Sequence, residues 1–318
     1  MINLNMPQKL KINVAGLVMN AFVDIDFPNI LKFIKRFSSN DNSKDPEISV
    51  HFSKSTERNI NISDNRKIIT ILGNDIDDLD DPFNLMGITQ ALFRFSAIHL
   101  AKIGTFLMHG SSAILDDKTI CFGDNGCSTA KTLGSLEIAQ TSGNYVADEF
   151  CFLNTKTGEI FGYSFIPIHV RNIVVEHLRL RHNLIMPETG YKITDAGYFI
   201  DPDKLFQLTS RKLDKLIYVE FSDNRDEIAK LSHDETTKAF RFCVIAHIAK
   251  LLHPELDRMQ FASKTDSLDK KTIDNNDITE IANQIFSANI IEECSQRIPG
   301  YKIVVREPCS IVTLLRKQ

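Results

Sequence analysis

The sequence has no long apolar run, no basic excess and no paired cysteine motif, and each absence narrows the class of protein. Its apolar stretches are all shorter than a membrane-spanning helix, and its first residues lack the basic start and apolar core of a signal peptide. The net charge of −4 and the pI near 6.1 provide no overall basic field for nucleic acid. We therefore expect a cytoplasmic protein that binds neither membrane nor nucleic acid.

The six cysteines lie mostly inside apolar stretches and show no CxxC or Cys/His spacing. A zinc site or a disulfide framework is therefore not expected, and a reducing compartment suits the chain. With 318 residues and 43% hydrophobic content, the chain is long enough for one large domain or two modest ones with proper cores. It contains no internal repeat and no low-complexity tract.

The most informative stretch, residues 106–153, has the pattern of strand, turn, strand, Gly-rich loop, helix, strand and acidic pair. An apolar segment at 119–122 precedes a loop that ends in Lys131 and Thr132, after which Leu133 and Leu136 indicate a helix. In this order, loop N–H groups and a helix N-terminus point at an anion, and the lysine adds a mobile charge. The sequence thus predicts a phosphate-binding loop. Its candidate residues are Gly123, Asp124, Asn125, Gly126, Cys127, Ser128, Thr129, Ala130, Lys131 and Thr132.

The loop departs from the usual G-x-x-x-x-G-K-[ST] pattern of such sites. Glycine is expected at positions 125 and 130, where this chain has Asn125 and Ala130. Asn tolerates a positive φ better than most residues, and Ala adds only one methyl group, so neither change excludes a phosphate site. An alignment that treats two of the residues 127–130 as an insertion stays open as well. The alternative interpretation is an ordinary glycine turn with a solvated Lys131.

An acidic pair follows at a distance that suits the crossover helix of a strand-helix-strand unit. The apolar segment 145–147 ends in Asp148 and Glu149. Carboxylates beside a phosphate loop suit Mg²⁺ binding and the activation of an incoming hydroxyl, so Thr132, Asp148 and Glu149 are the predicted metal ligands. His109, at the end of another apolar run, can touch phosphate or share a proton with the base. The alternatives are a solvated turn and a structural histidine.

These motifs together resemble those of the HPr kinase/phosphorylase group of P-loop kinases, which share the phosphoenolpyruvate carboxykinase-like nucleotide-binding fold. The likeness lies in the order of the motifs: HGSSA is followed by a strand, then by GDNG and AKT, then by a helix and finally by VADE. By this resemblance, His109 matches the active-site histidine and Lys131 the loop lysine. Thr132 matches the metal-binding hydroxyl and Asp148 the aspartate that activates the acceptor, while Glu149 stands where the family has a second Asp. Gly123, Asp124 and Gly126 match the opening of the loop.

The resemblance implies an α/β fold with a P-loop, phosphoenolpyruvate carboxykinase-like core and a β-rich N-terminal portion. It also implies an ATP-dependent kinase that uses Mg²⁺ and transfers the γ-phosphoryl group to a hydroxyl of a small molecule or a peptide serine. Asp148, His109 and Lys131 would be catalytic, and Arg171 is a further candidate for charge stabilisation, with a plain surface arginine as its alternative. A non-catalytic nucleotide sensor or scaffold subunit with a degenerate loop is the alternative function. The expected partners are a nucleotide and a hydroxyl-bearing acceptor, and a homo-oligomer stays open.

The chain is predicted to divide at residue 103. Residues 1–103 form a β-rich region with a connecting helix, either as a separate lobe or as an extension of the core's sheet, and residues 104–318 form the kinase core. Outside the central stretch, strands are predicted within 8–24 on both sides of Gly16 and at 48–52, 67–72, 159–166, 216–221, 301–305 and 310–315, and a loop or hairpin at 191–203. Helices are predicted at 27–37, 80–103, 226–231, 235–252 and 278–294.

Overall fold

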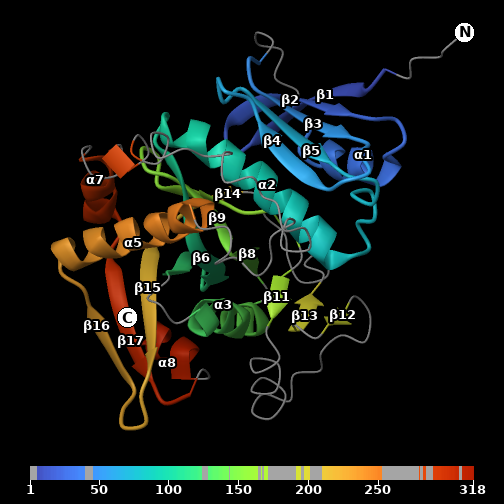
Figure 1. Ribbon diagram of the computed structural model, residues 1–318. Coiled ribbons are helices and arrows are strands. Elements are labelled where there is room, and N and C mark those ends of the chain that lie inside the picture. Colours follow the sequence, from blue (N-terminus) through green and yellow to red (C-terminus); the bar gives the residue numbers. More distant parts are fainter. Residues whose placement is uncertain are drawn as a thin grey trace, which may run out of the picture. The chain divides into compact units, whose positions relative to one another are not determined.

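The chain has a mixed α/β architecture of two compact units, seen in a computed structural model (Figure 1). The first unit comprises Met1–Ile103 and Ala249–Ile281, and the second comprises Gly104–Ile248 and Ala282–Gln318. The structure describes residues 6–39, 46–123, 128–142, 144–163, 166, 168–170, 191–194, 197–200, 210–252, 279, 282–283, 289–307 and 310–318.

The first unit is built on its own five-stranded sheet, in the order β1-β2-β3-β5-β4. Strands β1 and β2 form an antiparallel hairpin whose turn residues, Ala15 and Gly16, have φ of 50° and 98°. Positive φ at both positions is what a two-residue turn needs to match the twist of the strands. The elements are β1 (Gln8–Val14), β2 (Leu17–Val23), α1 (Pro28–Lys35), β3 (Ser49–Ser53), β4 (Asn59–Ile62), β5 (Ile68–Leu72) and α2 (Pro82–Ala101).

Helices α1 and α2 follow from the sequence pattern. Helix α1 begins with Pro28, whose missing N–H is no loss in the first turn, and it buries Ile30, Phe33 and Ile34 on one face. Phe37 then meets Phe93 of α2 edge-on, with ring centroids 6.0 Å apart. The predicted helices at 27–37 and 80–103 and the strands on both sides of Gly16 are confirmed, whereas β4 was not predicted.

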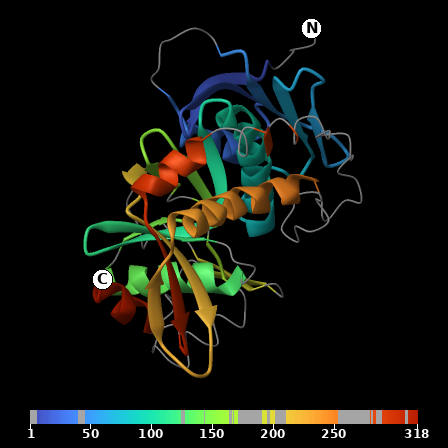
Figure 2. The ribbon, with the colours of Figure 1, turned by 90° about the vertical axis from the view of Figure 1, so that its left-hand side faces the viewer.

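The second unit contains a nine-stranded mixed sheet, in the order β14-β10-β9-β6-β7-β15-β17-β16, with β8 also paired to β6. Strands β7, β15 and β17 are parallel to one another, and β16 runs antiparallel at the edge (Figure 2). A second sheet has the order β11-β13-β12. The strands are β6 (Thr105–Leu115), β7 (Lys118–Gly123), β8 (Tyr145–Ala147), β9 (Phe150–Asn154), β10 (Glu159–Phe161), β11 (Ile168–Val170), β12 (Tyr191–Thr194), β13 (Gly197–Ile200), β14 (Ser210–Lys212), β15 (Lys215–Phe221), β16 (Glu227–Lys230) and β17 (Gly300–Val305).

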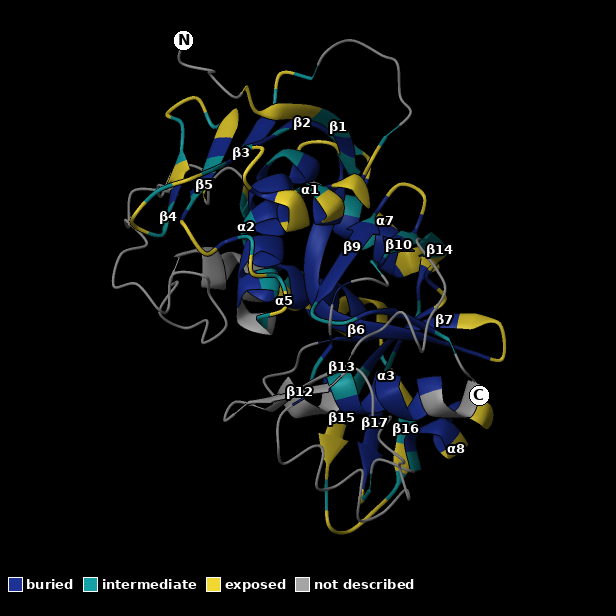
Figure 3. Ribbon diagram, turned by 90° about the vertical axis from the view of Figure 1, so that its right-hand side faces the viewer, coloured by how far each residue is buried: buried dark blue, intermediate teal, exposed yellow. Residues whose placement is uncertain are grey.

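Strand β6 is the centre of the second unit, and every one of its residues is buried (Figure 3). It turns into β7 through Asp116 and Asp117, whose φ values of 49° and 62° again form a two-residue hairpin turn. On its other edge, β6 pairs with β9 near its start and with β8 further along. The predicted order of strand, turn, strand, helix and strand in this stretch is therefore confirmed.

Helices cover both faces of this sheet. Ile217 and Val219 of β15 pack with α3 (Ser128–Ser142) and α8 (Ser310–Arg316) in one buried cluster. Tyr218 points to the opposite face, since side chains alternate along a strand, and its hydroxyl donates to the carbonyl of Ala239 in α5 at 2.6 Å. Among the described residues, the other helices of this unit are α5 (His233–Leu252) and α7 (Ile290–Arg297).

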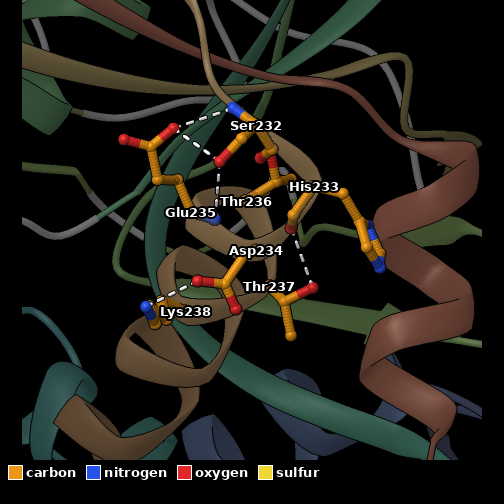
Figure 4. A network of polar contacts seen from close by, with 7 residues as sticks. All are labelled: Ser232, His233, Asp234, Glu235, Thr236, Thr237 and Lys238. Atoms are coloured by element: carbon orange, nitrogen blue, oxygen red, sulfur yellow. Dashed lines mark hydrogen bonds and ion pairs between the residues drawn. The ribbon is translucent and has the colours of Figure 1, made fainter.

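Helix α5 begins with a reciprocal cap (Figure 4). The Glu235 carboxylate accepts from the backbone N–H of Ser232 at 2.8 Å, while the Ser232 hydroxyl accepts from the N–H of Glu235 at 3.3 Å. Two N–H groups that the helix leaves free are satisfied in this way. The predicted helix at 235–252 is confirmed, and it starts two residues earlier than expected.

Two predicted elements are wrong. Residues 226–231 were expected to be a helix, but Glu227–Lys230 form β16, because pairing with β17 supplies sheet hydrogen bonds that override local helix propensity. Residues 310–315 were expected to be a strand because of their β-branched residues, but they lie in α8, which buries Ile311, Leu314 and Leu315 at helical spacing.

About half of the predicted helix at 278–294 lies outside the described residues, and its described part includes the start of α7. The predicted strands at 216–221 and 301–305 are confirmed as β15 and β17, and the hairpin interpretation of 191–203 is confirmed by the pairing of β12 with β13. Among the described helices, none combines the length and the hydropathy that crossing a membrane requires.

Candidate functional site

The end of β7 and the start of α3 carry the predicted phosphate-binding residues. Lys131 and Thr132 lie in the first turns of α3, which begins at Ser128 and therefore earlier than Leu133, where the sequence indicated it. Ser128, Thr129 and Ala130 open this helix. Asp124, Asn125, Gly126 and Cys127 lie outside the described residues.

Gly123, the last residue of β7, has a packing reason to be glycine that is independent of any phosphate. A Cβ atom at this position would lie 2.7 Å from the Sγ atom of Cys243 and 3.2 Å from the ring of Tyr218. Gly123 also pairs with Gly110 of β6, the residue that follows His109. The end of β7 is therefore held against β6 at the place where His109 stands.

Thr132 and Asp148 meet across the crossover from α3 to β8. The Thr132 hydroxyl donates to the Asp148 carboxylate with an Oγ1–Oδ1 distance of 3.0 Å. Lys131 is only 4% exposed, so the alternative of a solvated lysine is wrong. Its positive charge lowers the pKa of Asp148, which means that the ammonium group acts on the same carboxylate. Helix start and strand end thus bring a lysine, a hydroxyl and an acid together.

The carboxyl group of Asp148 has a pKa of about 6, raised from an ordinary value of 3.8. The largest cause is burial, which disfavours the charged form, and the second is the neighbouring charge of Glu149. The hydrogen bond from Thr132, the charge of Lys131 and a hydrogen bond from Tyr145 act in the opposite direction. An acid with a pKa this close to neutrality suits proton transfer near neutral pH.

The acidic pair, Asp148 and Glu149, lies in the tight turn between β8 and β9. Glu149 has a φ of 57°, and the N–H of Phe150 reaches back to the carbonyl of Asp148 at 2.5 Å. A three-residue turn with positive φ at a non-glycine residue is strained, and such strain concentrates at functional sites. Phe150 pairs with His109 across β6 and β9, and His109 Nε2 lies 3.9 Å from Glu149 Oε1. Both carboxylates are half-buried, so the alternative of a solvated turn is wrong.

Three buried hydroxyl groups behind these residues were not predicted. They belong to Ser111 of β6, Ser135 of α3 and Tyr145 of β8, and they contact one another. These three residues lie in segments whose sequence pattern indicates an apolar strand or a helix, and no regular spacing distinguishes serine or tyrosine there. A polar residue in an otherwise apolar strand, as in the HGSSA segment, was the available signal.

The donors present fit Mg²⁺ in kind. The Thr132 hydroxyl and the Asp148 carboxylate are hard oxygen ligands, and Mg²⁺ sites in proteins often use one or two such groups with phosphate oxygens and water. Within the described part of the chain, no group of three His, Cys, Asp or Glu side chains is arranged to hold a metal ion. These protein oxygens therefore suit a metal ion that phosphate oxygens would also coordinate. Arg171 lies outside the described residues.

Comparison with known proteins gives distant similarity to solved structures. No family model and no curated protein matches the chain. Among solved structures, the Hpr(Ser) kinase/phosphatase from Coxiella burnetii overlaps 67% of this chain and 94% of its own, with 11% sequence identity and a TM-score of 0.29. At this level of similarity the match carries no conclusion about the activity of this chain.

Proposed function

We propose that this chain is an ATP-dependent phosphotransferase with a P-loop core, which transfers the γ-phosphoryl group to a hydroxyl of a small molecule or a peptide serine. The observation that carries the proposal is the contact between Thr132 and Asp148 at 3.0 Å, beside the buried Lys131. Lysine, hydroxyl and carboxylate at a helix start and a strand end are the groups that phosphoryl transfer needs.

Each side chain has a role that its position supports. Lys131 and the first N–H groups of α3 would bind phosphate oxygens, since a helix N-terminus and an ammonium group both favour anions. Thr132 and Asp148 would hold Mg²⁺, which neutralises charge on the phosphates when it is bound. Asp148 would also accept the proton of the acceptor hydroxyl. His109, next to Glu149, would orient the acidic pair or balance its charge.

The experiment is release or transfer of label from γ-labelled ATP in the presence of Mg²⁺, with water as the default acceptor. Wild type is expected to release labelled phosphate slowly. Asp148→Asn is expected to bind nucleotide but to lose transfer by a factor on the order of 10² to 10⁴, the usual contribution of a general base. If wild type binds Mg·ATP and releases no label with any acceptor, the chain is a nucleotide sensor or scaffold and not a kinase.

A further inference from the structure

A cluster of three buried hydroxyl groups lies behind the candidate site. Ser111 and Ser135 are 0% exposed and Tyr145 is 3% exposed. The Ser111 Oγ atom lies 2.9 Å from the Tyr145 hydroxyl, Ser135 Oγ lies 3.4 Å from it, and the two serines contact each other directly. The three side chains come from β6 and α3, which carry His109 and Lys131, and from β8, which Asp148 follows directly.

Each member of this hydroxyl cluster is connected to a site residue. The Ser135 hydroxyl lies 3.2 Å from the carbonyl oxygen of Lys131 and 3.1 Å from that of Thr132, so it binds the backbone of the turn that carries both side chains. Tyr145 precedes Asp148 by three residues, on the strand that leads into it, and its hydroxyl lowers the pKa of the Asp148 carboxyl group. Ser111 follows His109 by two residues on β6, so both side chains point to the same face of the sheet.

The number of protons limits how the cluster is arranged. Each hydroxyl has a single proton to donate. When Ser135 donates to the carbonyl of Lys131, Ser111 can donate to the Ser135 oxygen, and Tyr145 can donate to the Ser111 oxygen. All three protons are then used, and the direction of the bonds is set by the Lys131 carbonyl, which can only accept. Buried hydroxyl groups cost free energy unless they are satisfied in this way, and a satisfied network fixes one geometry.

We propose that Ser111, Ser135 and Tyr145 are positioning residues, which hold the α3 turn of Lys131 and Thr132 in register with β8, the strand that leads into Asp148. None of the three needs to touch the nucleotide. The catalytic consequence rests on the proposed function, whereas the positioning itself is a property of the nucleotide-free protein. Apolar side chains of similar size at these positions would fill the core equally well, but they would leave the α3 turn free to shift relative to β8.

The test compares Tyr145→Phe and Ser135→Ala with a matched control, Thr237→Val. Thr237 is also a buried hydroxyl of the second unit: it lies 2.6 Å from Ser295 Oγ and donates to the carbonyl of His233 at 3.0 Å (Figure 4). All three variants lose one buried hydroxyl and should show comparable shifts of the urea midpoint. Only the first two should lower kcat, by about 10- to 100-fold as for groups that orient a ligand, with KM little changed.

A second readout keeps the two proposals apart. Amide hydrogen exchange of the nucleotide-free protein should rise about tenfold in the first turns of α3 in Tyr145→Phe and Ser135→Ala, and not in Thr237→Val. Should this rise occur while wild type transfers no label, the positioning stands and the kinase proposal fails. Unchanged exchange in α3 in both variants would overturn the positioning proposal, and so would a kcat as high as that of Thr237→Val.

Discussion

Burial of Asp148 raises its pKa toward the range that the proposed proton transfer needs, but the same burial destabilises the folded protein at neutral pH. Its folded pKa of about 6 means that the folded protein keeps the carboxyl proton up to that pH, whereas the unfolded chain releases it near 3.8. Between these two values the folded state binds the extra proton, so this group's contribution to stability falls as the pH rises through the window. Above about pH 7 the whole penalty is present, and it amounts to about 2 to 3 kcal/mol.

Asp148→Asn should therefore stabilise the protein while it removes activity. In metal-free buffer at pH 8, we expect the variant to unfold with a free energy about 2 to 3 kcal/mol higher than wild type, because Asn carries no charge and its oxygen can still accept from Thr132. At pH 5 the difference should shrink to about half. Urea titrations at both pH values measure it. An equal loss of stability at both would mean that the carboxylate serves structure alone.

At the scale of elements, α3 depends on close contact with β7. Gly134 faces Phe122, and a Cβ atom there would lie 2.6 Å from the nearest ring carbon. Helix propensity alone favours alanine over glycine by roughly 0.5 to 1 kcal/mol. Overpacking of a dense core usually costs about 1 to 3 kcal/mol, so the contact outweighs the propensity.

Gly134→Ala should thus destabilise the protein, by roughly 1 to 2 kcal/mol, in spite of its better helix propensity. It should also weaken nucleotide binding, because α3 must move away from β7 and carries Lys131 with it. The free energy of unfolding in urea and the affinity for Mg·ATP would be measured together. A gain in stability would show that α3 is loosely packed on β7 and that Gly134 is dispensable.

Local pattern predicted most elements and failed where a partner strand or a buried face decides the conformation. The strands at 119–122 and 145–147 were recognisable from their apolar residues, and the turn at Asp116 and Asp117 from its polar ones. The conformation of 227–230 depends on hydrogen bonds to β17, a strand some 75 residues away in the chain, and no local signal encodes them. For 310–315, the same apolar residues fit either element, and burial beside α3 decides for a helix.

At the scale of the whole molecule, the sequence predicts which residues belong to the site better than it predicts what holds them in place. Strand-helix-strand spacing brings Thr132 and Asp148 within hydrogen-bonding distance, as a crossover unit requires. The strained turn at Glu149 and the hydroxyl cluster depend on contacts among β6, α3 and β8, which only the assembled sheet defines. Gly123 is predicted to bind phosphate, and the structure gives this residue a separate packing role against Cys243 and Tyr218.

The proposed function requires that a metal-bound nucleotide binds beside Lys131, and isothermal titration of the whole chain with Mg·ATP measures this binding. Wild type should show saturable binding at one site that weakens when EDTA removes the metal. Lys131→Met, which keeps the length of the side chain and removes its charge, should bind at least about tenfold more weakly, as expected for the loss of one charge-assisted contact. No binding to wild type at millimolar nucleotide, or equal affinity in Lys131→Met, would contradict the account.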